Sequence, residues 1–318
     1  MTALPQPHPV PSPRAGAGPD DFSAGRPPGL YFAGVVPFPP VSNRPRLPAP
    51  KPAAALKPRR GNEPAYDFLA SLLDQAGIAI EQYRSNALLR RVPACLRALG
   101  VSTVAEAAER LAARPALAWS LLDVVLLGVT EFCRDPAAFQ HLKATVLPEL
   151  ARSQARLRIW SAGCSEGQEL YSVAACLAEA DWLERCELLG TDCRPEAIAR
   201  ARLGEYATHG QAIAPAAWRR AHLLPAGENV RIHPRLRVAT TWRVSDVLGH
   251  PEPGPWHLIF CRNLAIYLEP PVAAALWRRL GEQLAPGGYL VTGKAENPAA
   301  TGAFSRVAPC FYQLRPPC

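Results

Sequence analysis

The chain has 318 residues and a formal net charge of +8 at pH 7, long enough for one or two domains with a hydrophobic core. The charge is uneven: residues 1–63 hold eight Lys/Arg and three Asp/Glu, which leaves 27 basic and 24 acidic residues for residues 64–318. This nearly neutral body argues against a nucleic-acid-binding fold, and nine cysteines, odd in number and without a CxxC pair, argue against disulfides and a metal site.

The first segment, residues 1–63, is rich in Pro, Ala and Gly and has little hydrophobic periodicity. Such a composition buries too little apolar surface to offset the entropy of ordering, so we predict a disordered, basic tail. No charged segment followed by an apolar one begins the chain, and the apolar run 29–38 is too short to span a bilayer. We therefore expect a cytoplasmic protein that does not insert into membranes.

Residues 64–127 are predicted to form a small all-helical domain, because helical spacing of apolar residues continues there without a strand-like run. The first helix begins near Tyr66, and Gly77 is predicted to end it. Further helices are expected over about 82–99, 104–113 and 115–127. Pro93 lies inside the second of these four helices and should kink it. Either Ser102 or Thr103 should cap the third.

Residues 128–318 are predicted to form a second domain in which strands and helices alternate. We expect strands over 157–161, 186–192, 238–245, 256–262 and 289–293, helices over 136–152, 168–182, 195–203 and 270–284, and a closing hairpin over 304–308 and 310–314. The stretch 204–240 is polar and irregular and forms a small insertion. The alternation predicts an α/β fold, a largely parallel sheet with helices on both faces, whose ligands bind along the carboxyl edge.

The most informative segment is 157–171, where an apolar run ends in small residues and a helix-like stretch follows. Gly163 and Gly167 allow the backbone to turn tightly and to approach a ligand. Asp192 ends the next apolar run, and an acid in that place typically accepts hydrogen bonds from ribose hydroxyls. The glycine spacing fits neither GxGxxG nor a P-loop. A nucleoside without phosphates, such as S-adenosylmethionine, is therefore favoured over a nucleotide.

Five motifs, in order along residues 66–315, together resemble the chemotaxis receptor methyltransferase (CheR-type) family, which methylates chemoreceptor glutamates with S-adenosylmethionine. They are Thr130-Glu131-Phe132-Cys133-Arg134-Asp135, the segment from Trp160 to Glu169, Gly190-Thr191-Asp192, the segment from Phe260 to Tyr267, and Pro286-Gly287-Gly288-Tyr289-Leu290 with Gly293 and Glu296. The resemblance implies a Rossmann-like class I methyltransferase sheet, preceded by the all-helical domain and the disordered tail. Its product would be S-adenosylhomocysteine.

The resemblance also implies roles for particular residues, and each role is an expectation. Tyr267 and Arg134 are the catalytic candidates, with the Tyr267 hydroxyl near the transferred methyl group and Arg134 on a carboxylate. The other cofactor-binding candidates follow the loop order of the sheet: Thr130, Ala162, Gly163, Gly167, Glu169, Asp192, Asp246, Val247, Asn263 and Leu264. Among them, Glu169 would bind the ammonium end, Asp246 would lie near the adenine, and Asn263 would bind the amino-acid end.

Plainer interpretations stand beside these roles. Asp192 could cap the helix that follows it, Glu169 could be an exposed first-turn acid favoured by the helix dipole, and Tyr267 could be a core residue. The arginines of the helix 82–99 (Arg84, Arg90, Arg91 and Arg97) could face either an acidic receptor segment or solvent. The insertion at 204–240 falls where the family carries a small receptor-docking β-subdomain.

Several residues depart from the family pattern: Gly128 replaces an Asn, Cys133 a Phe, Gln168 a Glu, and Asp246 an Asn. The departures at Gly128, Cys133 and Gln168 keep an alternative open, a cofactor-binding regulatory module with impaired catalysis. A methyltransferase on another acceptor is a third possibility, and RNA is disfavoured as that acceptor. The first hypothesis remains glutamate methylation on the cytoplasmic helices of chemoreceptors by a monomeric enzyme that binds no nucleic acid.

Overall fold

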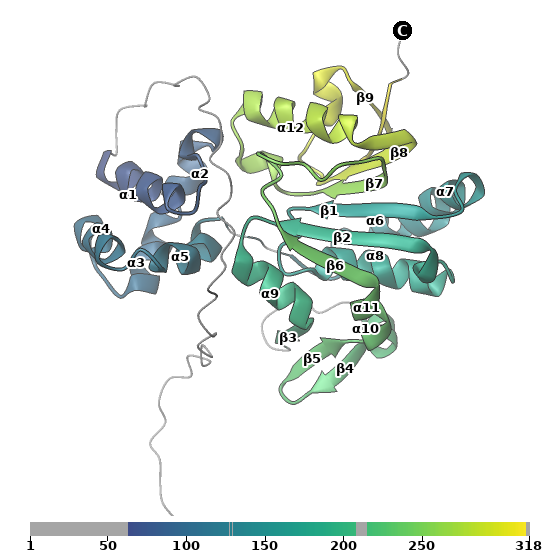
Figure 1. The fold of residues 1–318 in the computed structure, drawn as a ribbon, viewed down its shortest axis with the longest axis horizontal. Helices are drawn as coiled ribbons and strands as arrows, with labels where there is room; N and C mark the ends of the chain where they lie inside the picture. Colours follow the sequence, from purple (N-terminus) through teal and green to yellow (C-terminus); the bar gives the residue numbers. More distant parts are fainter. Residues whose placement is uncertain (1–62, 127, 129, 208–214, 316–318) are drawn as a thin grey trace, which may run out of the picture. The chain divides into compact units, whose positions relative to one another are not determined.

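The computed structural model describes residues 63–126, 128, 130–207 and 215–315 (Figure 1). These residues belong to one compact unit. The predicted disordered tail lies outside the described residues, apart from Glu63, which begins the first helix. No helix among the described residues is long and apolar enough to cross a membrane.

Helices are the regular elements of the described chain before residue 126. They are α1 (Glu63–Asp74), α2 (Ser85–Leu89), α3 (Val92–Leu99), α4 (Val104–Ala113) and α5 (Leu117–Val125), with a 3-10 turn at Ile80–Gln82. Apolar residues on their inner faces, such as Leu72 and Leu122, are fully buried in a shared core. Thr103 caps α4 by accepting from Glu106 N at 3.2 Å, and the Glu106 carboxylate accepts from Ser102 N at 3.0 Å. In this variant of the capping box the acid accepts from the residue before the N-cap, and the two bonds explain why α4 begins where the sequence predicts.

The predicted helix 82–99 is wrong as a single element. The chain is extended at Tyr83, where it pairs with Leu268 in an isolated antiparallel bridge, and the helix restarts first at Ser85 and again at Val92. Pro93 lies in the first turn of α3, a position where its missing N–H costs no helical hydrogen bond. A tertiary contact and a proline together therefore break the helix. Its arginines consequently do not share one helix face.

The sheet contains seven of the described strands in the order β6-β2-β1-β7-β8-β10-β9 (Figure 1). In chain order these are β1 (Leu157–Ala162), β2 (Cys186–Asp192), β6 (Thr240–Val244), β7 (Trp256–Cys261), β8 (Leu284–Thr292), β9 (Phe304–Ala308) and β10 (Phe311–Leu314). The first five pair in parallel, and the hairpin β9–β10 adds antiparallel pairs at one side. The predicted hairpin is confirmed, whereas β8 begins five residues before the predicted strand 289–293.

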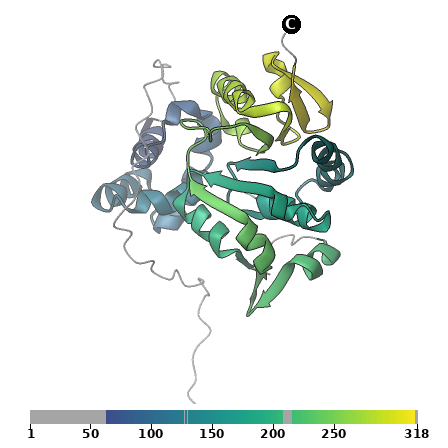
Figure 2. The ribbon, with the colours of Figure 1, turned by 45° about the vertical axis from the view of Figure 1, so that its right-hand side comes forward.

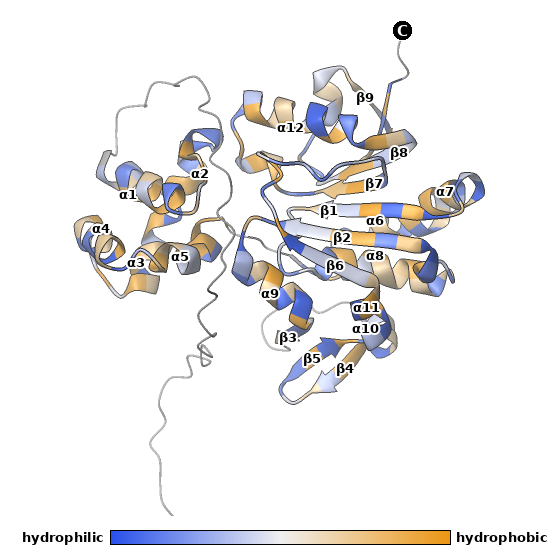
Figure 3. Cartoon of the chain, in the orientation of Figure 1, coloured by the Kyte–Doolittle hydropathy of each residue, from blue (hydrophilic) through white to orange (hydrophobic). Residues whose placement is uncertain are grey.

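Helices cover both faces of this sheet (Figure 1 and Figure 2). They are α6 (Pro136–His141), α7 (Leu147–Ser153), α8 (Gln168–Glu179), α9 (Pro195–Leu203) and α12 (Pro270–Glu282), and a π-helical turn at Leu142–Val146 joins α6 to α7. Along β1, Leu157 and Ile159 pack in the core beside α7 and α8, while Trp160 packs in the core beside α12. Because both faces are covered, a strand such as β7 is hydrophobic almost throughout (Figure 3).

The predicted irregular insertion contains a second, small antiparallel sheet with strand order β3-β5-β4. Its elements are β3 (Glu205–Ala207), α10 (Ala216–His222), β4 (Leu223–Ala226), β5 (Asn229–Ile232) and α11 (Pro234–Ala239). Trp218 and Tyr206 pack against Phe132 at ring-centroid distances of 4.8 and 5.0 Å. The insertion is therefore packed onto the segment that leads into α6.

Candidate functional site

A cavity of about 260 Å³ opens at the carboxyl ends of β1, β2, β6 and β7. In the sheet, β2 and β6 lie on one side of β1, and β7 lies on the other. The loops that follow β1 and β7 therefore run in opposite directions from this point of the sheet. Open α/β sheets bind their ligands at such switch points. Residues of α2 and of the segment after α5 form the opposite wall of the cavity.

The glycine loop after β1 forms the floor of the cavity. Gly163 has a φ of +73°, its N–H donates to Thr191 O at 2.8 Å, and it lines the cavity. Ala162 and Gly167 do not line the cavity. Ala162 is the buried last residue of β1, and a Cβ at Gly167 would overlap the Trp242 ring. Gly167 therefore makes room for packing between β6 and α8.

Asp192 lies at the end of β2 and is almost fully buried. Its carboxylate accepts from Ser165 N at 2.9 Å and, on the other oxygen, from Arg194 N at 3.0 Å and Arg194 Nε at 2.9 Å. The N-cap residue of α9 is Arg194, and no side-chain hydrogen bond caps this helix. Asp192 therefore holds the glycine loop and the start of α9, rather than acting as the N-cap of that helix.

Glu169 lies in the first turn of α8, but it is not a fully exposed acid. Its carboxylate accepts from Ser161 Oγ at 2.8 Å and from Arg262 Nη1 at 3.2 Å. The buried Arg262 also donates to Asp135, just before α6. Arg262 thus ties the end of β7 to two other elements and sets the orientation of the Glu169 side chain at the cavity wall.

The loop after β7 presents Asn263 and Leu264 to the cavity. Asn263 has a φ of +60°, an uncommon conformation for a residue with a side chain. The buried Glu296 carboxylate accepts from the backbone N–H groups of this loop: Asn263 at 2.8 Å, Leu264 at 3.0 Å and Ala265 at 2.7 Å. A buried carboxylate that collects several N–H donors fixes the loop in this strained shape.

The segment after β6 forms a third wall with Asp246, Val247 and Leu248. Asp246 accepts from Leu248 N at 2.9 Å in a local turn. Burial raises the pKa of Asp246 above its ordinary value, although this backbone donor and the charge of Arg279 act in the opposite direction. The combination of a polar edge with apolar Val247 and Leu248 suits a flat heteroaromatic ring that carries an amino group.

Tyr267 lines the cavity from the 3-10 turn Ala265–Tyr267. This turn is held by the helical segment, since Arg84 N donates to Tyr267 O at 2.8 Å and Arg84 Nε donates to Leu268 O at 2.9 Å. Thr130 and Arg134 line another side of the cavity, in the segment that leads to α6. Arg91, one of the arginines of the predicted basic helix, also lines it.

The cysteines at the cavity are not nucleophiles. Burial raises the pKa of Cys164 and of Cys193 well above the ordinary value of a thiol. Both thiols therefore stay protonated at neutral pH, and the thiolate is the reactive form. The ionised groups that the cavity offers are carboxylates and guanidinium groups.

Ten of the twelve predicted site residues line this cavity, all except Ala162 and Gly167. Sequence reasoning missed Arg194, Arg262 and Tyr83, which also line it, and it gave Glu296 no role. The sequence did contain an indication of the role of Arg194, because a basic residue two positions after Asp192 can pair with that carboxylate. The part played by Tyr83 depends on how the helices pack and has no local signature.

Comparison with known proteins is consistent with this site. Residues 128–308 match the family described as "CheR methyltransferase, SAM binding domain". A "Probable chemotaxis protein methyltransferase" of Rhizobium etli is 32% identical over 243 residues, covering 71% of this chain and 89% of that protein. "Chemotaxis protein methyltransferase 1" of Pseudomonas aeruginosa is 29% identical over 241 residues, covering 72% of this chain and 88% of that protein.

Proposed function

Because the chain belongs to the CheR methyltransferase family, we propose that it transfers the methyl group of S-adenosylmethionine to glutamate side-chain carboxylates of chemoreceptor-type proteins. The acceptors would be the cytoplasmic helices of such receptors, and the enzyme would act in the cytoplasm as a monomer. We further propose that residues 64–127 and 128–318 are two domains of this one compact unit, the second carrying most of the residues of the cofactor site.

One observation carries the proposal: residues from separate loops of the sheet converge on a single cavity with the chemistry of the cofactor. Acidic groups (Glu169, Asp192) suit an ammonium group and ribose hydroxyls, and the Arg134 guanidinium suits a carboxylate. Asp246 and Val247 offer a polar edge and an apolar face for adenine. The cavity therefore has complementary groups for the ammonium group, the ribose, the carboxylate and the adenine of S-adenosylmethionine.

The cofactor supplies a methyl group on a positively charged sulfur. In the transfer, a carboxylate oxygen of the acceptor would form a bond to the methyl carbon with its own electron pair, while the bond between sulfur and that carbon would break and leave a neutral thioether. Glutamate is ionised at pH 7, since its reference pKa is about 4.3, so no general base is required.

The task of the protein is then to hold two partners in line and to exclude water between them. Tyr267 would flank the acceptor carboxylate at the transfer point, and Arg134 would orient a carboxylate of the cofactor or of the substrate. The positive φ of Gly163 and the strained Asn263 loop would set the cofactor at a fixed depth. The lack of a nucleophile–base pair among the residues that line the cavity is consistent with this chemistry.

The test is incubation of the purified chain with S-adenosylmethionine tritiated on the methyl group and with chemoreceptor-containing membranes, followed by alkaline release of methanol. Glutamate methyl esters hydrolyse in base, so the proposal predicts volatile radioactivity that depends on the enzyme. Cofactor binding without release would instead support the regulatory-module alternative. Base-stable incorporation would indicate another acceptor.

A further inference from the structure

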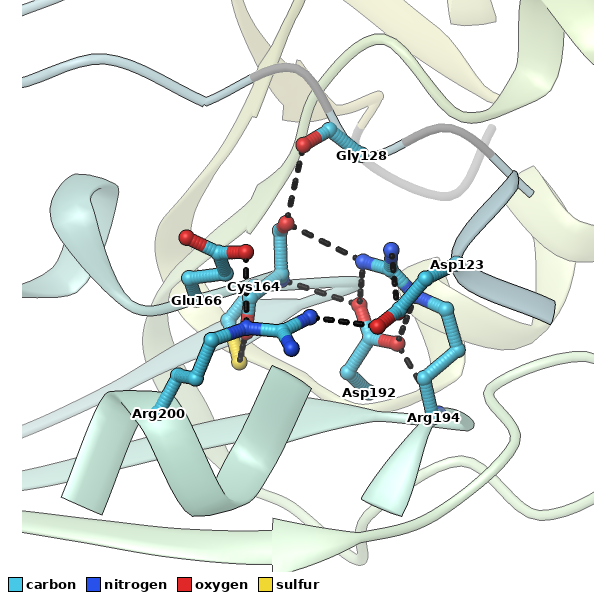
Figure 4. A network of polar contacts seen from close by, with 8 residues as sticks. Asp123, Gly128, Cys164, Glu166, Asp192, Arg194 and Arg200 are labelled. Carbon is cyan, nitrogen blue, oxygen red and sulfur yellow. Dashed lines mark hydrogen bonds and ion pairs between the residues drawn. The ribbon is translucent and has the colours of Figure 1, made fainter. Parts of the chain in front are cut away.

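Arg194 is a buried guanidinium between two carboxylates (Figure 4). Its Nε lies 2.9 Å from Asp192 Oδ1, and its Nη1 lies 3.3 Å from Asp123 Oδ1 on α5. Asp192 and Arg194 line the cavity, whereas Asp123 does not. The guanidinium therefore joins a carboxylate of the cavity to one behind it.

The acceptor capacity of Asp192 is already filled by the protein. A carboxylate offers about four lone-pair positions. Those of Asp192 receive Ser165 N, Arg194 N, Arg194 Nε and, at 3.3 Å, Arg194 Nη2. Two of these donors belong to the Arg194 side chain, so two hydroxyl groups that donate to Asp192 must take their places.

The backbone around Arg194 is shaped for this side chain. A Cβ at position 128 would overlap Arg194 Nη2 and Ser165 Oγ, so the glycine lets both side chains keep these positions without a shift. Ser165 Oγ accepts from Arg194 Nη2 at 3.0 Å and donates to Gly128 O at 3.2 Å. The guanidinium is therefore held in one buried position by several hydrogen bonds, unlike an ion pair on the protein surface.

Asp123 provides a second anchor for the same charge. It also pairs with Arg200, which in turn pairs with Glu166 at 2.8 Å (Figure 4). A guanidinium released by Asp192 would keep a carboxylate partner at Asp123 and would not be left as an unpaired buried charge. Such a second partner lowers the cost of the exchange, because an uncompensated buried charge is strongly unfavourable.

We propose that Arg194 sets the cofactor affinity of this chain: its guanidinium competes with the ribose hydroxyls for Asp192 and passes to Asp123 when the hydroxyls bind. This inference rests on the proposed function, since it assumes that a ribose binds at Asp192. Substitutions of Arg194 and of Asp123 should therefore change the cofactor affinity in opposite directions. Loss of Arg194 removes the competitor, whereas loss of the Asp123 charge leaves Asp192 as the stronger partner of the guanidinium.

The test is calorimetric titration of the full chain with S-adenosylhomocysteine. Arg194→Ala should tighten binding by about tenfold or more, the scale of one hydrogen bond to a charged group. Asp123→Asn should weaken binding severalfold, and this loss should vanish in the double variant with Arg194→Ala. Weaker binding in both single variants would mean that the ion pairs only hold the structure together, and it would overturn the proposal.

Arg235→Ala is the matched control, because it removes an arginine from an ion pair, with Glu184, without touching Asp123, Asp192 or the cavity. Its affinity should stay within about twofold of wild type, less than the change expected for one charged hydrogen bond. Arg194→Gln keeps the aliphatic stem without the charge and replaces Arg194→Ala if thermal unfolding shows that the latter is not folded. Absence of binding in wild type itself would contradict the proposed function, whereas binding that Arg194→Ala and Arg194→Gln fail to tighten would contradict only the role of Arg194.

Discussion

At the scale of single residues, Glu296 is the least conspicuous group on which the site depends. It does not line the cavity, yet its carboxylate accepts from the N–H groups of Asn263, Leu264, Ala265 and Gly293. Four backbone donors thus share one buried acceptor group. The shape of the loop that carries Asn263 therefore depends on an acid 33 residues later in the chain.

Replacing this acid with its amide, Glu296→Gln, should loosen the loop. An amide NH₂ cannot accept, so buried N–H groups would lose their acceptor at a cost of about 2 kcal/mol in unfolding free energy. If about 1.4 kcal/mol of this free energy serves to position Asn263 for the ligand, binding of S-adenosylhomocysteine should weaken about tenfold. Denaturant unfolding and calorimetry measure the two effects.

Glu282→Gln is the matched control for that experiment, because Glu282 is an exposed carboxylate at the end of α12. It should leave both stability and binding near wild type. Equal effects of the two substitutions would show that the Glu296 carboxylate has no special role.

Asp246 leads to a prediction about pH. Burial raises its pKa in the folded protein, so the ionised form is disfavoured by folding at neutral pH. This cost is present above the folded-state pKa and disappears as the pH falls below the ordinary value of an aspartate. Asp246→Asn carries no charge and keeps an oxygen for Leu248 N. Its melting temperature should exceed that of wild type at pH 7, and the difference should shrink toward pH 4.

The control for Asp246→Asn is Asp181→Asn, which changes an exposed aspartate after α8 in the same way. This control should show no comparable pH-dependent gain. A lower melting temperature for Asp246→Asn at pH 7 would mean that the ionised carboxylate stabilises the fold, contrary to the burial argument.

At the scale of elements, close packing of β6 on β2 explains two glycines that sequence motifs assign to a ligand site. Trp242 of β6 lies over Gly190 of β2 and beside Gly167, and a Cβ at either glycine would overlap its ring. The ring also packs against Tyr171 of α8, with centroids 5.1 Å apart. These glycines hold Trp242, and through it β6, in place beside the cavity.

Gly190→Ala should therefore destabilise the chain. Overpacking of a close-packed interior typically costs about 1–3 kcal/mol, and the buried Trp242 ring, packed between β2 and Tyr171 of α8, has little room to move. A second change, Trp242→Leu, removes the overlapping ring atoms and should recover part of the stability in the double variant. Purely additive losses in urea unfolding would show that the two side chains do not compete for the same space.

Element prediction from the sequence succeeded where the pattern is local and failed where a distant contact decides. Helix α4 carries its own capping box, so its bounds follow from neighbouring residues. The break at Tyr83 does not, because it depends on pairing with Leu268, almost two hundred residues away. The early start of β8 likewise depends on its pairing with β7 at Trp256.

At the scale of the whole molecule, the parallel sheet brings residues that are separated along the chain close together in space. Asp192, Asp246 and Asn263 are separated in sequence, yet each lies at or just after the carboxyl end of a parallel strand and therefore reaches the same edge. Their meeting at the cavity was predictable from the strand pattern alone. The partnership of Arg194 with Asp123 was not, since it depends on how α5 packs beside α9.

The central claim is that this edge cavity binds S-adenosylmethionine in position for transfer to a carboxylate. A crystal structure of the chain with S-adenosylhomocysteine tests it most directly. We expect the adenosine between Asp192 and Asp246 and the sulfur facing Tyr267. Binding at another surface, or a reversed molecule with its amino-acid end at Asp246, would contradict this claim.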